Sequence, residues 1–105
     1  MQKRCEVQFT ESAEQDLDGI ITWYDAQLVP EVGQRLVATV IEHVEQLEFF
    51  PESGTVTPEF ENPALRELQL PPFRIVYRVE SATLVSIVRV WRSERLMDPA
   101  LGGNA

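Results

Sequence analysis

The spacing of hydrophobic and polar residues changes along the chain, and these changes divide it into elements. Residues 6–9 alternate polar and apolar side chains, which predicts a short half-buried strand, with Cys5 in phase with its apolar positions. Residues 13–28 and 32–47 carry apolar side chains three to four positions apart, which predicts two amphipathic helices. Thr10 and Ser12 both offer an N-cap for the first helix. Pro30 separates the helices and can begin the second, so we expect an antiparallel helical hairpin.

The second half of the chain has strand character. Short turns at residues 71–72 and 81–82 separate three runs, which predicts an antiparallel meander. The runs are Leu65 to Leu70, Phe73 to Glu80 and Thr83 to Trp91. We therefore predict one α+β domain over residues 1–105, in the order β-α-α-β-β-β. Its tail, about 96–105, is expected to be flexible.

Alternation within the last two strands predicts two different sheet faces. The aromatic and branched side chains of the middle strand are expected to cover the hairpin, and these are Phe73, Ile75, Tyr77 and Val79. The other face is expected to be open, apolar at its centre and basic at its edges, which is typical of a protein-binding surface. We place Val76, Val85, Ile87 and Trp91 at its centre and Arg74, Arg78 and Arg89 at its edges. The alternative is a minor core that the C-terminal tail closes.

Composition narrows the class of protein. No apolar run approaches the roughly 20 residues that span a bilayer, and the N-terminus lacks the features of a signal peptide, so we expect a cytoplasmic protein without a membrane partner. The single cysteine, Cys5, excludes an internal disulfide and has no zinc-site partners. His43 has no nearby ligand at metal-binding spacing and is expected to be structural. We therefore predict no metal and no cofactor.

Charge is unevenly distributed along the chain. The net charge of −8 argues against strong direct binding to nucleic acid. Residues 1–64 carry three basic and thirteen acidic residues, whereas residues 65–95 carry six arginines and three glutamates. Arginine suits bidentate recognition of carboxylates and phosphates, so the set favours a site or partner surface in the C-terminal third. Any one of these arginines could instead pair with the acidic helices of the same chain.

Several motifs together resemble a known family. They are Gly54-x-x-x-Pro58-Glu59-Phe60, Leu65-Arg66-Glu67-Leu68, the run Pro-Phe-Arg-Ile-Val-Tyr-Arg-Val at residues 72–79, and Val88-Arg89-Val90-Trp91-Arg92. An Ala-x-x-Asp-Leu pattern at residues 13–17 also matches. Over residues 6 to about 95, the chain resembles ParE-type toxins of the ParE/RelE superfamily. The resemblance implies a helical hairpin packed on one face of a small, mostly antiparallel sheet. It also implies the toxin of a type II toxin–antitoxin (plasmid stabilisation) system, paired with a ParD-like antitoxin whose disordered segment folds onto it.

The superfamily has two branches, and the residues favour one of them. ParE members poison DNA gyrase, whereas RelE members are ribosome-dependent mRNA endoribonucleases. Of the residues that RelE-like members use, Arg74 matches, but Glu67 stands where a lysine is expected, and residues 96–105 contain neither Tyr nor His. We therefore expect a gyrase inhibitor without catalytic residues. The alternatives are a degenerate endoribonuclease that uses Arg74 and Arg92, and an inactive relic that binds only its antitoxin.

This interpretation assigns two groups of binding residues. Gyrase as the target is expected to contact the C-terminal end of the chain, at Arg89, Trp91, Arg92 and Arg95. The antitoxin is expected to cover the open sheet face, burying apolar side chains while its carboxylates meet arginines. The residues assigned to antitoxin binding are Arg74, Val76, Arg78, Val85 and Ile87.

Overall fold

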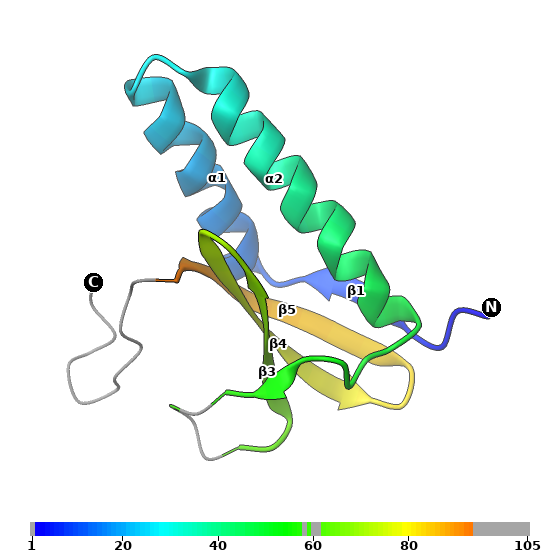
Figure 1. Ribbon diagram of the computed structural model, residues 1–105. Coiled ribbons are helices and arrows are strands. Elements are labelled where there is room, and N and C mark those ends of the chain that lie inside the picture. Colours follow the sequence, from blue (N-terminus) through cyan, green and yellow to red (C-terminus); the bar gives the residue numbers. More distant parts are fainter. Residues whose placement is uncertain (1, 58, 60–61, 94–105) are drawn as a thin grey trace.

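Two helices lie against one side of a five-stranded sheet, and their joined ends extend beyond it (Figure 1). The computed structural model of the chain describes residues 2–57, 59 and 62–93. The elements are β1 (Glu6–Phe9), α1 (Glu11–Ala26), α2 (Pro30–Val44), the 3-10 helix η1 (Glu45–Glu48), β2 (Thr55–Val56), β3 (Leu65–Leu70), β4 (Phe73–Ser81) and β5 (Leu84–Arg92). The α+β fold and the predicted element order are confirmed. The predicted flexible tail lies outside the described residues.

The sheet has the order β1-β5-β4-β3-β2. β1 pairs with β5 in parallel, and the other neighbours are antiparallel, so the predicted meander is confirmed and the N-terminal strand joins its far edge. The two-residue strand β2 was not predicted, because its residues show no alternation of their own and depend on pairing with β3. β1 ends at Phe9, opposite Ile87, so the last part of β5 extends beyond its parallel neighbour.

The helix ends follow from local chemistry. Thr10 is the N-cap of α1, since its side-chain oxygen accepts a hydrogen bond from the backbone N–H of Ala13 at 3.1 Å. Leu28, which the apolar spacing placed in the helix, instead lies in the connection with a φ of 64°. Pro30 begins α2 as predicted, where its missing N–H costs no helical hydrogen bond. None of the helices in the described ranges has the length and apolar content that a bilayer crossing requires.

The core lies between the hairpin and the facing side of the sheet. Ala13, Val40 and Leu47 from the helical half are completely buried there. The prediction for the middle strand is confirmed, because Phe73, Ile75 and Tyr77 belong to this core and Val79 packs against it. Cys5 is also buried, and its thiol donates to the carbonyl oxygen of Leu47 at 3.0 Å.

The predicted position of Val85 and Ile87 on the open sheet face is wrong. Both side chains are 0% exposed and lie in the core, opposite Val79 and Tyr77 of β4. A shift in the β4–β5 pairing explains the error. Val76 pairs with Arg89 while Tyr77 pairs with Ile87, which leaves Val88 as an extra residue in a bulge.

One extra residue exchanges the two faces of a strand, because side chains alternate with a period of two. N-terminal to the bulge, the odd-numbered side chains of β5 face the core. C-terminal to it, Val90 pairs with Ile75 and takes the core side, while Trp91 pairs with Arg74 on the opposite side. The bulge thus places residues 89, 91 and 92 at the end of β5 differently from a regular strand.

Candidate partner-binding site at the end of strand β5

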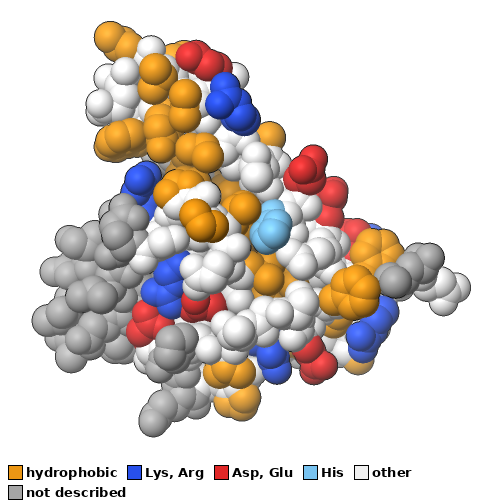
Figure 2. All heavy atoms as spheres, in the orientation of Figure 1, with side chains coloured by type: hydrophobic (Ala, Val, Ile, Leu, Met, Phe, Trp, Pro, Cys, Tyr) orange, Lys and Arg blue, Asp and Glu red, His pale blue; other side chains and the backbone are white. Residues whose placement is uncertain are grey.

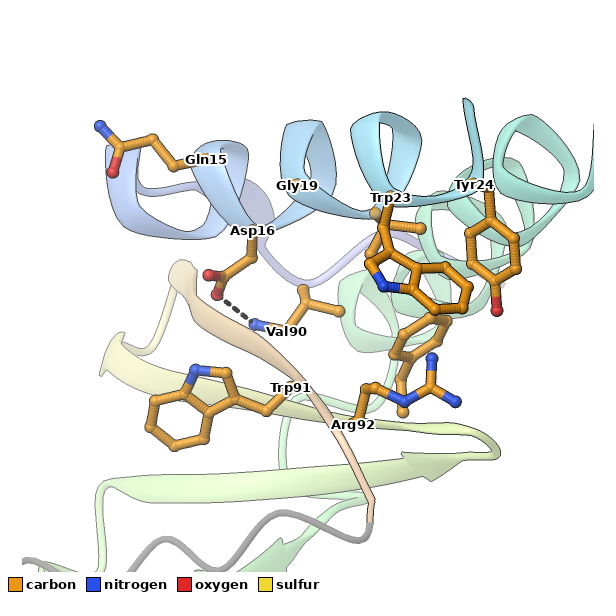
Figure 3. Close-up of a pocket in the computed structure, with 10 residues that line it drawn as sticks. Gln15, Asp16, Gly19, Trp23, Tyr24, Val90, Trp91 and Arg92 are labelled. Carbon is orange, nitrogen blue, oxygen red and sulfur yellow. Dashed lines mark hydrogen bonds between the residues drawn. The ribbon is translucent and has the colours of Figure 1, made fainter. Parts of the chain in front are cut away.

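A groove of about 460 Å³ separates α1 from the C-terminal end of β5. Figure 3 shows one wall formed by side chains of α1 and the other by the last residues of β5. Residues of both signs of charge and four aromatic rings line it. The lining consists of Gln15, Asp16, Gly19, Ile20, Trp23, Tyr24, Phe73, Val90, Trp91 and Arg92. An apolar groove with a few polar groups at its rim is the usual form of a site for a partner's anchoring side chain.

Aromatic side chains dominate the α1 wall. Trp23 is 53% exposed and meets Tyr24 edge to face, with ring centroids 4.8 Å apart. Both rings point from α1 toward the strand that carries Arg92 (Figure 3). The guanidinium of Arg92 lies 5.9 Å from the ring centre of Phe73, in cation–π geometry. The groove therefore offers flat apolar surfaces beside one cationic group.

Hydrophobic side chains also gather on the part of the hairpin that extends beyond the sheet (Figure 2). Leu28, in the connection between the helices, is 86% exposed, and Trp23 lies one and a half turns before it. Sequence analysis missed Trp23 as a site residue. The available signal was a large aromatic residue beside the apolar stripe, on the side of the helix that carries Asp16 and Gly19.

Asp16 joins α1 to the end of β5. Arg89 Nε donates to Asp16 Oδ2 at 2.8 Å and Arg89 Nη2 donates to Oδ1 at 2.9 Å, which is a bidentate ion pair. The backbone N–H of Val90 also donates to Oδ2 at 2.8 Å (Figure 3). The hydrogen bonds to Asp16 raise the pKa of Arg89 above its usual value. Asp16 lies 73 positions from Arg89 in the sequence, and no local pattern indicated this contact.

The predicted target-binding residues come together at this end of the strand. Arg89 lies over the ring of Trp91, 4.6 Å from its centre, and Arg92 follows on the groove side. Trp91 and Arg92 both line the groove. Arg95, the fourth predicted contact, lies outside the described residues.

The face of the sheet away from the helices carries a buried charge cluster. Arg74 on β4 donates from Nη1 and Nη2 to the two carboxylate oxygens of Glu59, at 2.8 and 2.9 Å. Its Nη2 also contacts Glu67 on β3, which accepts a hydrogen bond from Gln69. The hydrogen bond to Glu59, and then that to Glu67, raise the pKa of Arg74, so it stays charged. Arg74 is only 8% exposed, and its fork is occupied by its own chain.

The predicted antitoxin-binding residues are only partly brought together. Arg74, Val76 and Arg78 share one face of β4 as expected. Val76, however, is only 2% exposed, and Val85 and Ile87 lie in the core on the other side of the sheet, where they present no surface to a partner. Arg78, which is half-buried, has no ion pair within the described part of the chain.

Within the ranges that the structure describes, no three His, Cys, Asp or Glu side chains lie together as metal ligands would. The groove and the end of β5 present arginines, aromatic rings and the carboxylate of Asp16. These groups can bind and orient a partner.

Comparisons with known proteins place this geometry in a family. A model of the family described as "ParE toxin of type II toxin-antitoxin system, parDE" matches residues 7–97. A solved structure of the chromosomal ParDE toxin–antitoxin system from P. aeruginosa contains a chain that is 30% identical, with a TM-score of 0.73. The similarity covers 87% of this chain and 98% of that one.

A chain of the RelBE2 toxin–antitoxin complex from Mycobacterium tuberculosis shares the fold. It has a TM-score of 0.63 and is 23% identical, over 87% of this chain and 99% of that one. The search of curated proteins found no match. The two structures show that the hairpin-on-sheet arrangement occurs in toxin–antitoxin complexes of both names.

Proposed function

Since this chain belongs to the ParE toxin family of type II toxin–antitoxin systems, we propose that it is a non-enzymatic toxin that inhibits DNA gyrase and is neutralised by a ParD-like antitoxin. We prefer gyrase to the ribosome as the target because the guanidinium of Arg74 is already bonded within its own chain. This arginine is the residue that matches the RelE type of RNase, and two carboxylates of its own chain hold its guanidinium.

The charge of that cluster argues against phosphate binding. The carboxylates of Glu59 and Glu67 hold the guanidinium of Arg74, which would have to leave them to bind a phosphate. A transition state with developing negative charge needs cations that are already oriented toward it. The only lysine is Lys3, at the far end of the chain, which salt-bridges Glu6 and Glu48. These features support a binding toxin.

The end of β5 is the proposed gyrase-contacting surface. Arg89, Trp91 and Arg92 combine charge-assisted donors with an aromatic face, and such residues dominate the energetics of protein interfaces. They also stand beside the groove, so one partner can contact the strand end and insert a side chain against Trp23. Arg95 is the fourth proposed contact.

Neutralisation follows if the antitoxin occupies the same groove. We place an apolar segment of the antitoxin along α1, over Trp23 and Tyr24, with a carboxylate near Arg92. Such a segment would cover Trp91 and Arg92, so gyrase and antitoxin would compete. The sheet face with Arg78 is a second proposed contact, where Arg74 and Val76 lie at a buried centre. This assignment replaces the predicted role of Val85 and Ile87.

DNA cleavage by purified gyrase with ATP tests the proposed target. Adding the toxin should accumulate linear DNA, and Arg92→Ala should reduce this effect. Arg35→Ala, which removes an exposed arginine of α2, is the matched control and should behave like the wild type. No linear DNA with a folded wild-type protein would contradict the proposal. Cleavage of ribosome-bound mRNA, lost in Arg74→Ala, would then establish the endoribonuclease instead.

Affinity for the antitoxin tests the proposed groove. Trp23→Ser should weaken binding of the co-expressed antitoxin by about tenfold or more, because exposed tryptophans at interface centres contribute strongly. Ile41→Ser is the control, since Ile41 is also exposed (44%) but lies on α2 and does not line the groove. Equal losses in the two variants would argue against the groove as the docking site.

A further inference from the structure

The last residues of β5 extend past the end of β1, so their edge faces α1. At this edge the carboxylate of Asp16 accepts a hydrogen bond from the backbone N–H of Val90 at 2.8 Å. In a longer β1, a backbone carbonyl oxygen of that strand would accept this hydrogen bond instead. The same carboxylate accepts two hydrogen bonds from Arg89, one from Nε and one from Nη2. One side chain therefore fixes the strand backbone and the arginine beside it.

Arg89 in turn orders the next aromatic side chain. Its guanidinium carbon lies 4.6 Å from the centre of the Trp91 ring, which is cation–π contact distance. The side chain of Asp16 is 14% exposed and that of Arg89 is 37% exposed. The carboxylate of the pair is therefore mostly buried, whereas the arginine is accessible to a partner. Asp16, Arg89 and Trp91 thus form a chain of contacts from α1 to the surface.

We infer that Asp16 is a positioning residue of the toxin: it holds Arg89, and through Arg89 the ring of Trp91, in the orientation that the partner recognises. The inference rests on the proposed function, because it takes the end of β5 as the partner-binding surface. It adds a residue that neither the sequence motifs nor the groove alone assign to recognition. The ion pair uses Nε and Nη2 of Arg89, so Nη1 is not bonded to Asp16 and can donate to a partner's carboxylate or carbonyl oxygen.

The pairing also sets the kind of recognition. With Asp16 the Arg89 charge is neutralised locally, so the partner meets oriented donors and a fixed ring rather than an excess positive charge. Releasing Arg89 would leave a mobile cation over a mobile indole. Affinity for the partner should then fall because the ordering must occur on binding. A change confined to the stability of the fold would leave the orientation of Trp91 intact.

Fluorescence of Trp91 tests this ordering without any partner. The chain has two tryptophans, so Trp23→Phe leaves Trp91 as the only reporter. In that background Asp16→Asn should raise the acrylamide quenching of Trp91 by about twofold and lower its anisotropy, since the stacked arginine no longer restrains the ring. Asp18→Asn removes an exposed acid from the same helix and should leave both values unchanged.

Activity supplies the second measurement, in the chain that retains Trp23. Asp16→Asn should need about tenfold more protein for the same linear DNA in the gyrase assay, the loss expected for one charge-assisted hydrogen bond. Arg89→Lys keeps the charge but loses the fork, and should show the same two defects. It also serves as the test if Asp16→Asn does not fold.

The two measurements separate the inference from the proposed function. Unchanged quenching and anisotropy in folded Asp16→Asn would overturn the inference whatever the target is. Altered Trp91 signals with unchanged gyrase cleavage would overturn it as well, because the ordering would then not serve recognition. Should the wild type fail on gyrase, the proposed target falls, and the fluorescence measurement still decides whether Asp16 orders this surface.

Discussion

Replacing Gly54 by alanine tests the close packing where the chain enters the sheet. Gly54 immediately precedes β2, and a Cβ atom built on it would lie 2.5 Å from the carbonyl oxygen of Glu67. It would also lie 2.7 Å from Tyr77 Oη and 2.8 Å from Tyr77 Cε1. The backbone N–H of Gly54 donates to Tyr77 Oη at 2.9 Å, and Arg66 donates to its carbonyl oxygen at 2.8 Å. A methyl group therefore cannot enter without moving backbone or a buried ring.

The magnitude follows from two losses. Overpacking of a filled site costs about 1–3 kcal/mol. The shift also weakens the buried hydrogen bond to Tyr77, which is worth about 1 kcal/mol. A total loss of about 2–4 kcal/mol is a large share of the roughly 5–15 kcal/mol that stabilises a domain. With a typical slope of unfolding free energy against urea concentration, this loss lowers the midpoint of urea unfolding by roughly 1–2 M.

Urea unfolding followed by circular dichroism measures the effect, and Gly19→Ala provides the matched control. Gly19 lies within α1, is exposed and has no atom within 4 Å of an added Cβ. Alanine there should stabilise the helix by up to about 1 kcal/mol, because glycine is the poorer helix former. The two substitutions thus have opposite expected signs. A Gly54→Ala variant with the wild-type midpoint would refute the packing argument.

Three further predictions follow from the core. Ile87→Ala should lower the free energy of unfolding by about 2–5 kcal/mol, because the Ile87 side chain is completely buried. Val88→Ala, at the bulge, should lower it by less than about 1.5 kcal/mol. Equal losses of the two variants in urea unfolding would contradict the bulge. Burial raises the pKa of Tyr77 in the folded chain. The contribution of Tyr77 to the free energy of unfolding is therefore fully present below the pKa of tyrosine in the unfolded chain, which is about 10, and stability should fall as the pH rises above that value. Tyr77→Phe should reduce that slope in unfolding curves at pH 9 to 11, and an unchanged slope would exclude this tyrosine as its source. Burial also raises the pKa of the Cys5 thiol, which should react with a thiol reagent far more slowly in the folded chain than in urea; equal rates would show that it is accessible.

The sequence pattern was sufficient for the two α-helices, for every strand except β2 and for one sheet face. The period of the helices, Pro30 between them and the strict alternation from Phe73 to Val79 each reflect a local constraint, and each prediction is confirmed. Local periodicity failed at Val88, because a bulge depends on how two strands pair. Extending the alternation through that residue reversed the assignment of Val85 and Ile87.

The site depended still more on long-range contacts. The end of β5 was identified from its arginines and Trp91, but the groove was not, because its other wall comes from α1. Asp16 stood in the sequence as the acid of the Ala-x-x-Asp-Leu pattern and as an acidic residue early in a helix, where the helix dipole favours it. Neither observation indicated its partner. Its role emerged when the fold brought Arg89 and the backbone of Val90 to it.

Two arginines of the C-terminal third are paired with carboxylates inside the folded chain. Arg74 pairs with Glu59 and Glu67, and Arg89 pairs with Asp16 of the acidic N-terminal half. Arg74 and Arg89 are therefore not available as unpaired cations, which supply most of the affinity for a nucleic-acid backbone. What these pairs supply is fixed geometry, with an aromatic ring and directed donors beside an apolar groove. Those are the features by which proteins recognise other proteins, and for this reason the charge pattern and the groove both support a protein as the target.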